Sequence, residues 1–145
     1  MKRSMLISLL IMFLLLAACQ GNEPIDERDQ GSGRIITVPG GSYTDVSVKG
    51  LQTLLSNKDF LFINVHIPFE GDIPNTDLSI PYNQIEANMD LLPEDKDAQI
   101  VLYCRSDRMS TIAAKTLVGL GYTNVWNVSG GMVAWERTGL PLEEN

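Results

Sequence analysis

The stretch I-V-L-Y-C-R-S-D-R-M-S, residues 100–110, decides the fold, because an apolar run ends there at a cysteine and a helical pattern follows. The run from Ile100 to Tyr103 is uninterrupted, as is typical of a strand buried on both faces of a parallel sheet. From Met109 or Ser110 onward, apolar residues recur at the spacing of one helix face. The stretch therefore predicts a central strand, a short loop and a helix.

Cys104 occupies the position in such a loop where open α/β sheets bind ligands, beyond the carboxyl end of a strand. The unpaired N–H groups and the dipole of the following helix would favour a thiolate there. Arg105 and Arg108 add positive charge. This setting predicts a nucleophilic thiol. A buried structural cysteine in a tight turn is the alternative.

The rest of the chain alternates between strand and helix patterns, which predicts a mostly parallel sheet covered on both faces. The expected strands are residues 34–38, 60–65, 100–103 and 124–128. The expected helices are residues 46–55, 82–92, a segment from 109 or 110 to about 120, and a last one before Pro141. Gly121 is expected to be a left-handed helix cap, and Trp126 and Trp135 are expected to pack in the core.

The amino terminus has the pattern of an export signal: Lys2 and Arg3 precede an apolar run that ends in L-A-A-C at residues 16–19. This ending resembles a bacterial lipobox. The resemblance implies lipidation of Cys19, and hence a protein anchored to the outer side of a cell membrane, at the cell surface or in the periplasm. An ordinary secreted protein or an uncleaved anchor is the alternative. The predicted organisation is a signal peptide (1–18), a lipid-anchored flexible tether (19–33) and one domain (34–145).

Charge and cysteine content narrow the function further. Loss of residues 1–18 removes two positive charges and no negative one, so the formal charge falls from −7 to −9. Such an acidic chain is a poor nucleic-acid binder. With Cys19 acylated, Cys104 has no partner for an internal disulfide. No cluster of residues has metal-ligand spacing, so we expect no metal. We also expect no organic cofactor, and we expect the protein to be a monomer.

Residues 35–142 resemble a rhodanese (sulfurtransferase) domain, most specifically in their second half. The similarity is carried by Y-C-R-S at 103–106, L-G-Y-T-N-V-W-N at 120–127, S-G-G-M-V-A-W-E at 129–136 and G-L-P-L at 139–142. An earlier strand and irregular segment, residues 60–81, resemble the family's first motif. The resemblance implies a rhodanese-like three-layer α/β fold, with a mostly parallel central sheet and helices on both faces.

The resemblance also implies an activity. Cys104 would take a sulfane sulfur from a small donor such as thiosulfate and pass it, as a persulfide, to a thiol or cyanide. Arg105 and Arg108 would bind the anionic donor. The backbone of the whole loop would cradle the transferred sulfur, with substrate-binding positions at Arg105, Ser106, Asp107, Arg108, Met109 and Ser110.

Three departures from the family pattern bear on the donor. Asp107 stands where family loops often have glycine, a position that can require a left-handed conformation. Its carboxylate would oppose the two arginines unless it pairs with Arg108. Met109 stands where arginine is common. Asn64-Val65-His66 replaces Asp-Val-Arg, which makes His66 a candidate pocket residue or else an ordinary loop histidine. Glu70 and Asp72 are acidic residues that could face the pocket or water.

Two other functions compete with sulfur transfer. A non-catalytic binding module on the same fold is favoured by Asp107 and by the missing motif residues, whereas Cys104 argues against it. A phosphatase would need arginine six residues after the cysteine to bind the phosphoryl group, and this chain has Ser110 there.

Overall fold

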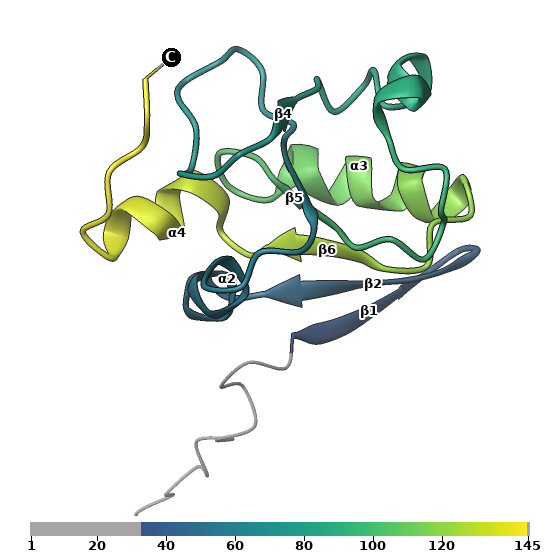
Figure 1. The fold of residues 1–145 in the computed structure, drawn as a ribbon, viewed down its shortest axis with the longest axis horizontal. Coiled ribbons are helices and arrows are strands. Elements are labelled where there is room, and N and C mark those ends of the chain that lie inside the picture. Colours follow the sequence, from purple (N-terminus) through teal and green to yellow (C-terminus); the bar gives the residue numbers. More distant parts are fainter. Residues whose placement is uncertain (1–32, 145) are drawn as a thin grey trace, which may run out of the picture.

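The computed structural model describes residues 33–144, which form one six-stranded sheet with helices on both sides (Figure 1). The predicted signal peptide, Cys19 and nearly all of the predicted tether lie outside the described residues. The strands are β1 (Arg34–Val38), β2 (Gly41–Val46), β3 (Leu61–Asn64), β4 (Leu78–Ser79), β5 (Ile100–Tyr103) and β6 (Val125–Val128). They are ordered β1-β2-β6-β5-β3-β4 across the sheet, and all neighbours are parallel except β1 and β2.

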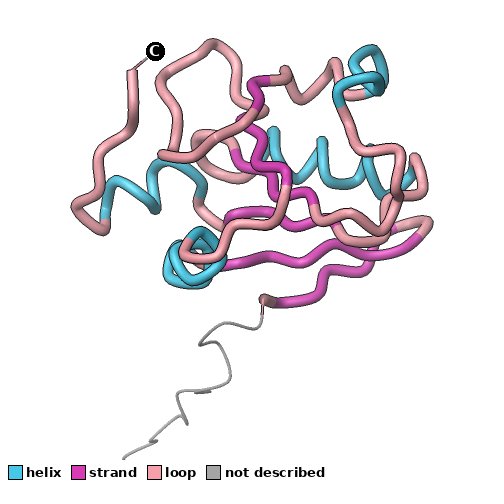
Figure 2. The backbone as a smooth tube through the Cα atoms, in the orientation of Figure 1, coloured by secondary structure: helices cyan, strands magenta, loops and turns pink. Residues whose placement is uncertain are grey.

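The helices separate into two layers, which Figure 2 shows on either side of the strands. They are α2 (Val48–Leu55), the 3-10 helix η2 (Glu86–Leu91), α3 (Arg108–Gly119) and α4 (Gly131–Arg137). One core cluster joins α3 to Ile100 and Leu102 of β5. The other joins α2 and α4 to Val101 and Tyr103 of the same strand. Alternate residues of β5 thus face opposite layers, and both layers bury it completely.

This arrangement confirms the predicted fold class of a mostly parallel sheet between helices. The parallel strands β3 and β5 pair Asn64 with Tyr103, so the loops that follow them leave the sheet at the same edge. Gly121 has φ = +90°, as its predicted role as a left-handed cap requires. Trp135 is buried, but Trp126 is only partly buried and packs at the margin of its cluster.

The structure differs from the sequence prediction in three places. The short strand β4 lies within the segment after β3, which the sequence predicts to be irregular. The helix expected over residues 46–55 begins at Val48, because Ser47 caps it by accepting a hydrogen bond from the Gly50 N–H, and the residues before it form the unexpected strand β2. The helix expected over residues 82–92 is only the short η2, which buries none of its own residues and is followed by Pro93. Within residues 33–144, no helix is long and apolar enough to cross a membrane.

Candidate active site

Cys104 lies directly beyond β5 and is only 2% exposed. Four residues later the chain enters α3, so the thiol sits at the junction that the sequence predicts. The Ser110 hydroxyl lies 3.4 Å from Cys104 Sγ and 3.1 Å from the Asp107 carbonyl oxygen. A hydroxyl has one proton, so Ser110 can donate to either acceptor, and a negatively charged sulfur would draw that proton. The structure therefore gives Ser110 a side-chain contact with the Cys104 thiol.

Backbone hydrogen bonds from the start of α4 fix the position of the cysteine loop. The Met132 N–H donates to the Cys104 carbonyl and the Val133 N–H to the Arg105 carbonyl, each at 3.0 Å. Gly131 has φ = +52°, and a Cβ atom there would lie 2.0 Å from the Cys104 carbonyl oxygen. Only glycine permits this close approach. The sequence shows the consecutive glycines 130 and 131, but only the structure reveals that they pack against the cysteine loop.

Asp107 does not adopt either arrangement expected for it. Its φ is −176°, which is extended backbone, so the expectation of a left-handed residue is wrong. Its carboxylate accepts a hydrogen bond of 2.9 Å from the Gly130 N–H, rather than forming the pair with Arg108 that the sequence raised as an alternative. The side chain thus ties the exposed loop to the turn before α4, which compensates part of its charge.

The segment after β3 is held by a network of buried polar side chains instead. Asn64 Nδ2 donates to Asp72 Oδ1 at 2.8 Å and to the Gly71 carbonyl at 3.1 Å, while Asn64 Oδ1 accepts from the His66 N–H. Asp72 is buried in this network and also pairs through its backbone with Glu143. Asn64 therefore holds the segment after β3 in place through its own hydrogen bonds, without a salt bridge to residue 66.

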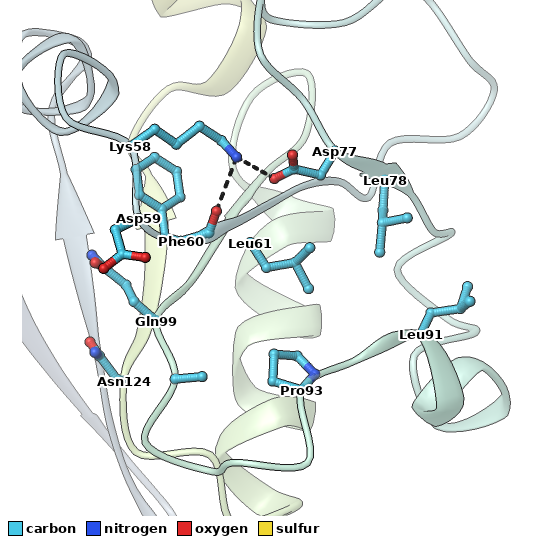
Figure 3. A pocket seen from close by; sticks show the side chains of 11 residues that line it. Lys58, Asp59, Phe60, Leu61, Asp77, Leu78, Leu91, Pro93, Gln99 and Asn124 are labelled. Atoms are coloured by element: carbon cyan, nitrogen blue, oxygen red, sulfur yellow. Dashed lines mark hydrogen bonds and ion pairs between the residues drawn. The ribbon is translucent and has the colours of Figure 1, made fainter.

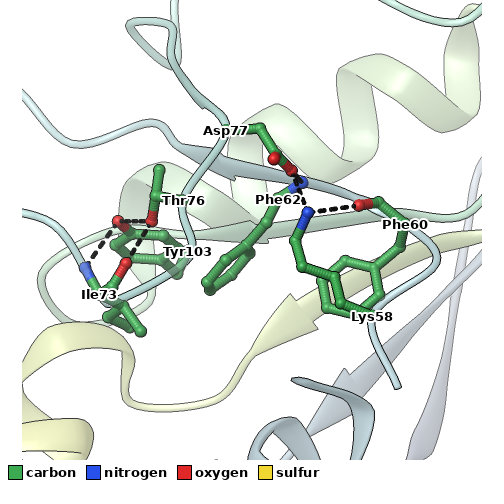
Figure 4. A network of polar contacts seen from close by, with 7 residues as sticks. All are labelled: Lys58, Phe60, Phe62, Ile73, Thr76, Asp77 and Tyr103. Atoms are coloured by element: carbon green, nitrogen blue, oxygen red, sulfur yellow. Dashed lines mark hydrogen bonds and ion pairs between the residues drawn. The ribbon is translucent and has the colours of Figure 1, made fainter. Parts of the chain in front are cut away.

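The Tyr103 hydroxyl is the other centre of this network, and Figure 4 shows its contacts with Ile73 and Thr76. It accepts from the Ile73 N–H at 3.0 Å, lies 2.7 Å from Thr76 Oγ1 and donates to Asp72 Oδ1 at 3.0 Å. Burial, with a smaller contribution from the charge of Asp72, raises the pKa of Tyr103 above its ordinary value. Tyr103 precedes Cys104, so the same residue that ends β5 also anchors the neighbouring loop.

His66, Glu70 and Arg105 meet where the two loops approach each other. Glu70 Oε2 lies 2.6 Å from Arg105 Nη1 and 3.3 Å from His66 Nε2. The ring of His66 is buried, and neither of its nitrogens makes a hydrogen bond with good geometry to any residue that the structure describes. The sequence raised Glu70 and Asp72 as pocket residues; the structure brings Glu70 to the cysteine loop and buries Asp72 in the network.

The remaining predicted loop residues surround the cysteine from the solvent side. Ser106 and Arg108 are exposed, and Met109 is half-buried against the core cluster of α3. Among residues 33–144, no group of three or more side chains has the makeup of a metal site. The loop thus offers backbone N–H groups and guanidinium groups as its means of binding a ligand.

A groove of about 910 Å³ lies at the opposite edge of the sheet (Figure 3). It is lined by Leu61, at the start of β3, and by Gln99 and Asn124, which precede β5 and β6. Lys58 bridges Asp77 and the Phe60 carbonyl along its rim. Cys104 follows the carboxyl end of β5, so this groove is separate from the candidate active site.

The structure is an α/β domain with a mostly parallel sheet, and its buried cysteine lies in the loop at the carboxyl edge of that sheet. The family model for the rhodanese-like domain matches residues 62–138. The chain therefore belongs to the rhodanese-like domain family, as the sequence motifs indicated.

Relatives and solved structures agree with this assignment. A protein of Allochromatium vinosum named sulfurtransferase is 38% identical over 94 residues, which cover 63% of this chain and 85% of the relative. A chloroplastic rhodanese-like domain-containing protein of Arabidopsis thaliana is 28% identical, over 62% of this chain and 56% of its own length. The domain therefore spans most of one relative and about half of the other.

Two solved structures illustrate the shared fold. The rhodanese-like domain of an Anabaena protein superimposes with a TM-score of 0.61 at 21% identity, covering 70% of this chain and 79% of that one. A rhodanese-like domain protein of Staphylococcus aureus gives a TM-score of 0.57 at 26% identity, covering 69% of this chain and 98% of that one. These likenesses show that the described domain has the fold of solved rhodanese-like domains.

Proposed function

We propose that this protein is a sulfurtransferase that carries sulfane sulfur as a persulfide on Cys104. The observation that supports this most is the position of the thiol, between the end of a buried strand and the first turn of α3, with the Ser110 hydroxyl 3.4 Å from the sulfur. The N–H groups of the first helical turn have no acceptor within the helix, so they can stabilise a negatively charged sulfur in the loop.

The reaction has two steps and needs no oxidant. The Cys104 thiolate attacks the outer sulfur of thiosulfate, the S–S bond of the donor breaks, and sulfite leaves with the bonding electron pair. Cyanide or a thiol then takes the outer sulfur from the Cys104 persulfide, and the thiolate is restored. Burial of Cys104 limits the reaction to donors whose outer sulfur can pass between the loop residues.

Turnover with thiosulfate and cyanide tests this function. The purified full-length protein should form thiocyanate, and Cys104→Ser should form none while unfolding at the same temperature as the wild type. The same experiment with inorganic polysulfide covers donors other than thiosulfate. Thiocyanate formation that persists in Cys104→Ser would contradict the proposal.

A binding module without catalysis is the second candidate, because one observation favours it. Arg105, the first positive group after the nucleophile, is already engaged by Glu70 at 2.6 Å. If the loop only binds a partner or a small anion, Cys104 should remain free of sulfur with every donor and should still react with a small alkylating reagent.

We also propose that the domain is attached to the outer side of a membrane through a lipid on Cys19. The support is the lipobox-like L-A-A-C at residues 16–19. Gly33 precedes β1, which is antiparallel to β2, so the described chain begins at the carboxyl edge of the sheet, where Cys104 also lies. Cys19→Ser should release the protein from the membrane fraction, and retention of that variant would rule out the lipid anchor.

A further inference from the structure

The contact between Glu70 and Arg105 bears on which donors this site accepts. Asn64 of β3 pairs with Tyr103 of β5, so His66 and Arg105 follow that pair at matching positions in the two neighbouring loops. Glu70 reaches back across these loops and places Oε2 2.6 Å from Arg105 Nη1. The guanidinium group that directly follows the nucleophile is therefore bound to a carboxylate before any donor arrives.

His66 lies behind this ion pair and limits where Glu70 can go. The imidazole is 8% exposed, and its Nε2 is 3.3 Å from Glu70 Oε2. By contrast, the side chains of Glu70 and Arg105 are 39% and 50% exposed. The ion pair is thus open to an approaching molecule on one side and backed by a buried ring on the other.

An anionic donor meets a balanced set of charges at this site. Arg105 and Arg108 are opposed by the carboxylates of Glu70 and Asp107, and the second of these is held by the Gly130 N–H. Thiosulfate carries two negative charges, so it competes with Glu70 for the Arg105 guanidinium group and meets the repulsion of that carboxylate as it approaches. A donor with one negative charge meets less of this repulsion, and an uncharged donor meets none.

We propose that Glu70 is a specificity-determining residue, which selects small persulfides of the form R–S–S–H over the thiosulfate dianion. This inference rests on the proposed function and names its donor class. The Cys104 thiolate attacks the outer sulfur of the persulfide, the S–S bond of the donor breaks, and the electron pair leaves with R–S⁻. The proton stays on the transferred sulfur, so the product is Cys104–S–S–H and nothing is oxidised or reduced overall.

Single-turnover loading of the full-length protein tests the assignment. The rate at which Cys104 gains one sulfur is measured by intact mass with thiosulfate and with 2-hydroxyethyl persulfide, whose organic part is uncharged. Glu70→Gln keeps the size of the side chain and removes its charge. We expect the ratio of the thiosulfate rate constant to the persulfide rate constant to rise about tenfold in this variant.

Two further variants separate the specificity of Glu70 from a general effect of charge or folding. Glu94→Gln removes the same charge from an exposed residue that lies before β5, on the far side of the sheet, and should leave the ratio at the wild-type value. In an Arg105→Gln background, Glu70→Gln should raise the ratio much less, because the guanidinium group that it frees is gone.

The possible failures of the two proposals are distinguishable. If both donors load Cys104 but Glu70→Gln leaves the ratio unchanged or lowers it, the specificity assignment is wrong and sulfur transfer stands. If neither donor loads Cys104 in the wild type or in Glu70→Gln, the proposed function fails, and the donor assignment fails with it.

Discussion

The two loops that form the candidate active site leave the same edge of the sheet but are held in different ways. The cysteine loop after β5 is fixed mainly by backbone hydrogen bonds to the start of α4, at Cys104 and Arg105. The segment after β3 is fixed by the buried side chains of Asn64, Asp72 and Tyr103. Because backbone groups hold the cysteine loop, its exposed side chains can be substituted without loss of the loop conformation, and such substitutions can change the reactivity of the site. The segment after β3 depends instead on particular side chains.

Gly131→Ala should have the largest effect on stability, because it disrupts the backbone contact between α4 and the cysteine loop. The new Cβ would lie 2.0 Å from the Cys104 carbonyl oxygen, at a φ of +52° that a side chain rarely adopts. We expect a loss of at least about 3 kcal/mol in the free energy of unfolding, or no folded protein. Urea unfolding measures it.

Gly119→Ala is the matched control for this substitution. Gly119 ends α3, and no side chain or loop packed against it comes within 4 Å of the position of an added Cβ. It should be neutral or slightly stabilising, since alanine favours a helix more than glycine does. If Gly131→Ala is as well tolerated as Gly119→Ala, α4 does not anchor the loop.

Tyr103→Phe attacks the side-chain anchor and should cost about 1–3 kcal/mol of stability, because Asp72, Ile73 and Thr76 lose a buried hydrogen-bond partner. Its effect should also depend on pH. Burial raises the pKa of Tyr103 in the folded state, so the wild type keeps this contribution below the ordinary tyrosine pKa and loses it as the pH rises above that value.

The pH dependence is measured by urea unfolding of the wild type and Tyr103→Phe at pH 8 and at pH 10.5. The wild type should lose more stability than the variant between these two values. Tyr82→Phe, at a half-buried tyrosine outside the network, serves as the control and should change stability by less than about 0.5 kcal/mol. Equal alkaline losses in wild type and Tyr103→Phe would contradict the network.

Ser110→Ala should leave the fold intact and slow the chemistry of the cysteine loop. The Ser110 hydroxyl lies 3.4 Å from Cys104 Sγ and can donate a hydrogen bond to a negatively charged sulfur. Its loss should slow alkylation of Cys104 by a small reagent about fivefold, as expected for one hydrogen bond of roughly 1 kcal/mol. An alkylation rate that does not fall would show that Ser110 donates only to the Asp107 carbonyl.

Asp107→Asn should have the smallest effect of the series. The amide keeps an acceptor oxygen for the Gly130 N–H and removes the carboxylate charge from the loop. We expect alkylation of Cys104 at pH 6 to become about twofold faster, because one exposed negative charge no longer opposes the thiolate. Glu94→Gln should show no such gain, and slower alkylation in Asp107→Asn would contradict this reading of the charge.

The sequence predicts the parts of this molecule that local pattern determines. Residues 100–103, the position of Cys104 and the helix after it follow from apolar spacing. The sequence does not predict the strand β2, because only a short run separates Gly41 from the helix cap Ser47. The pairing of this run with β1 and β6 decides that it is a strand. The helical pattern over residues 82–92 also predicts a longer helix than η2, which buries none of its residues fully.

The candidate site is only half predictable for a related reason. Cys104 and Arg105 lie in one loop, and Arg108 begins the helix that directly follows it. By contrast, the contact of Glu70 with Arg105 joins residues 35 positions apart, and that of Asp107 with Gly130 joins residues 23 apart. No periodicity encodes such contacts. They follow from the parallel pairing of β3 and β5 and from the glycines that let α4 approach the loop.

The central claim is that Cys104 carries transferable sulfur, and intact mass tests it most directly. The reduced, desalted full-length protein and its Cys104→Ser variant are exposed to thiosulfate and, separately, to 2-hydroxyethyl persulfide. We predict that the wild type gains the mass of one sulfur atom, loses it when cyanide is added, and that Cys104→Ser gains nothing. An unchanged wild-type mass with both donors, while Cys104 still reacts with a small alkylating reagent, would contradict sulfur transfer and favour the binding module.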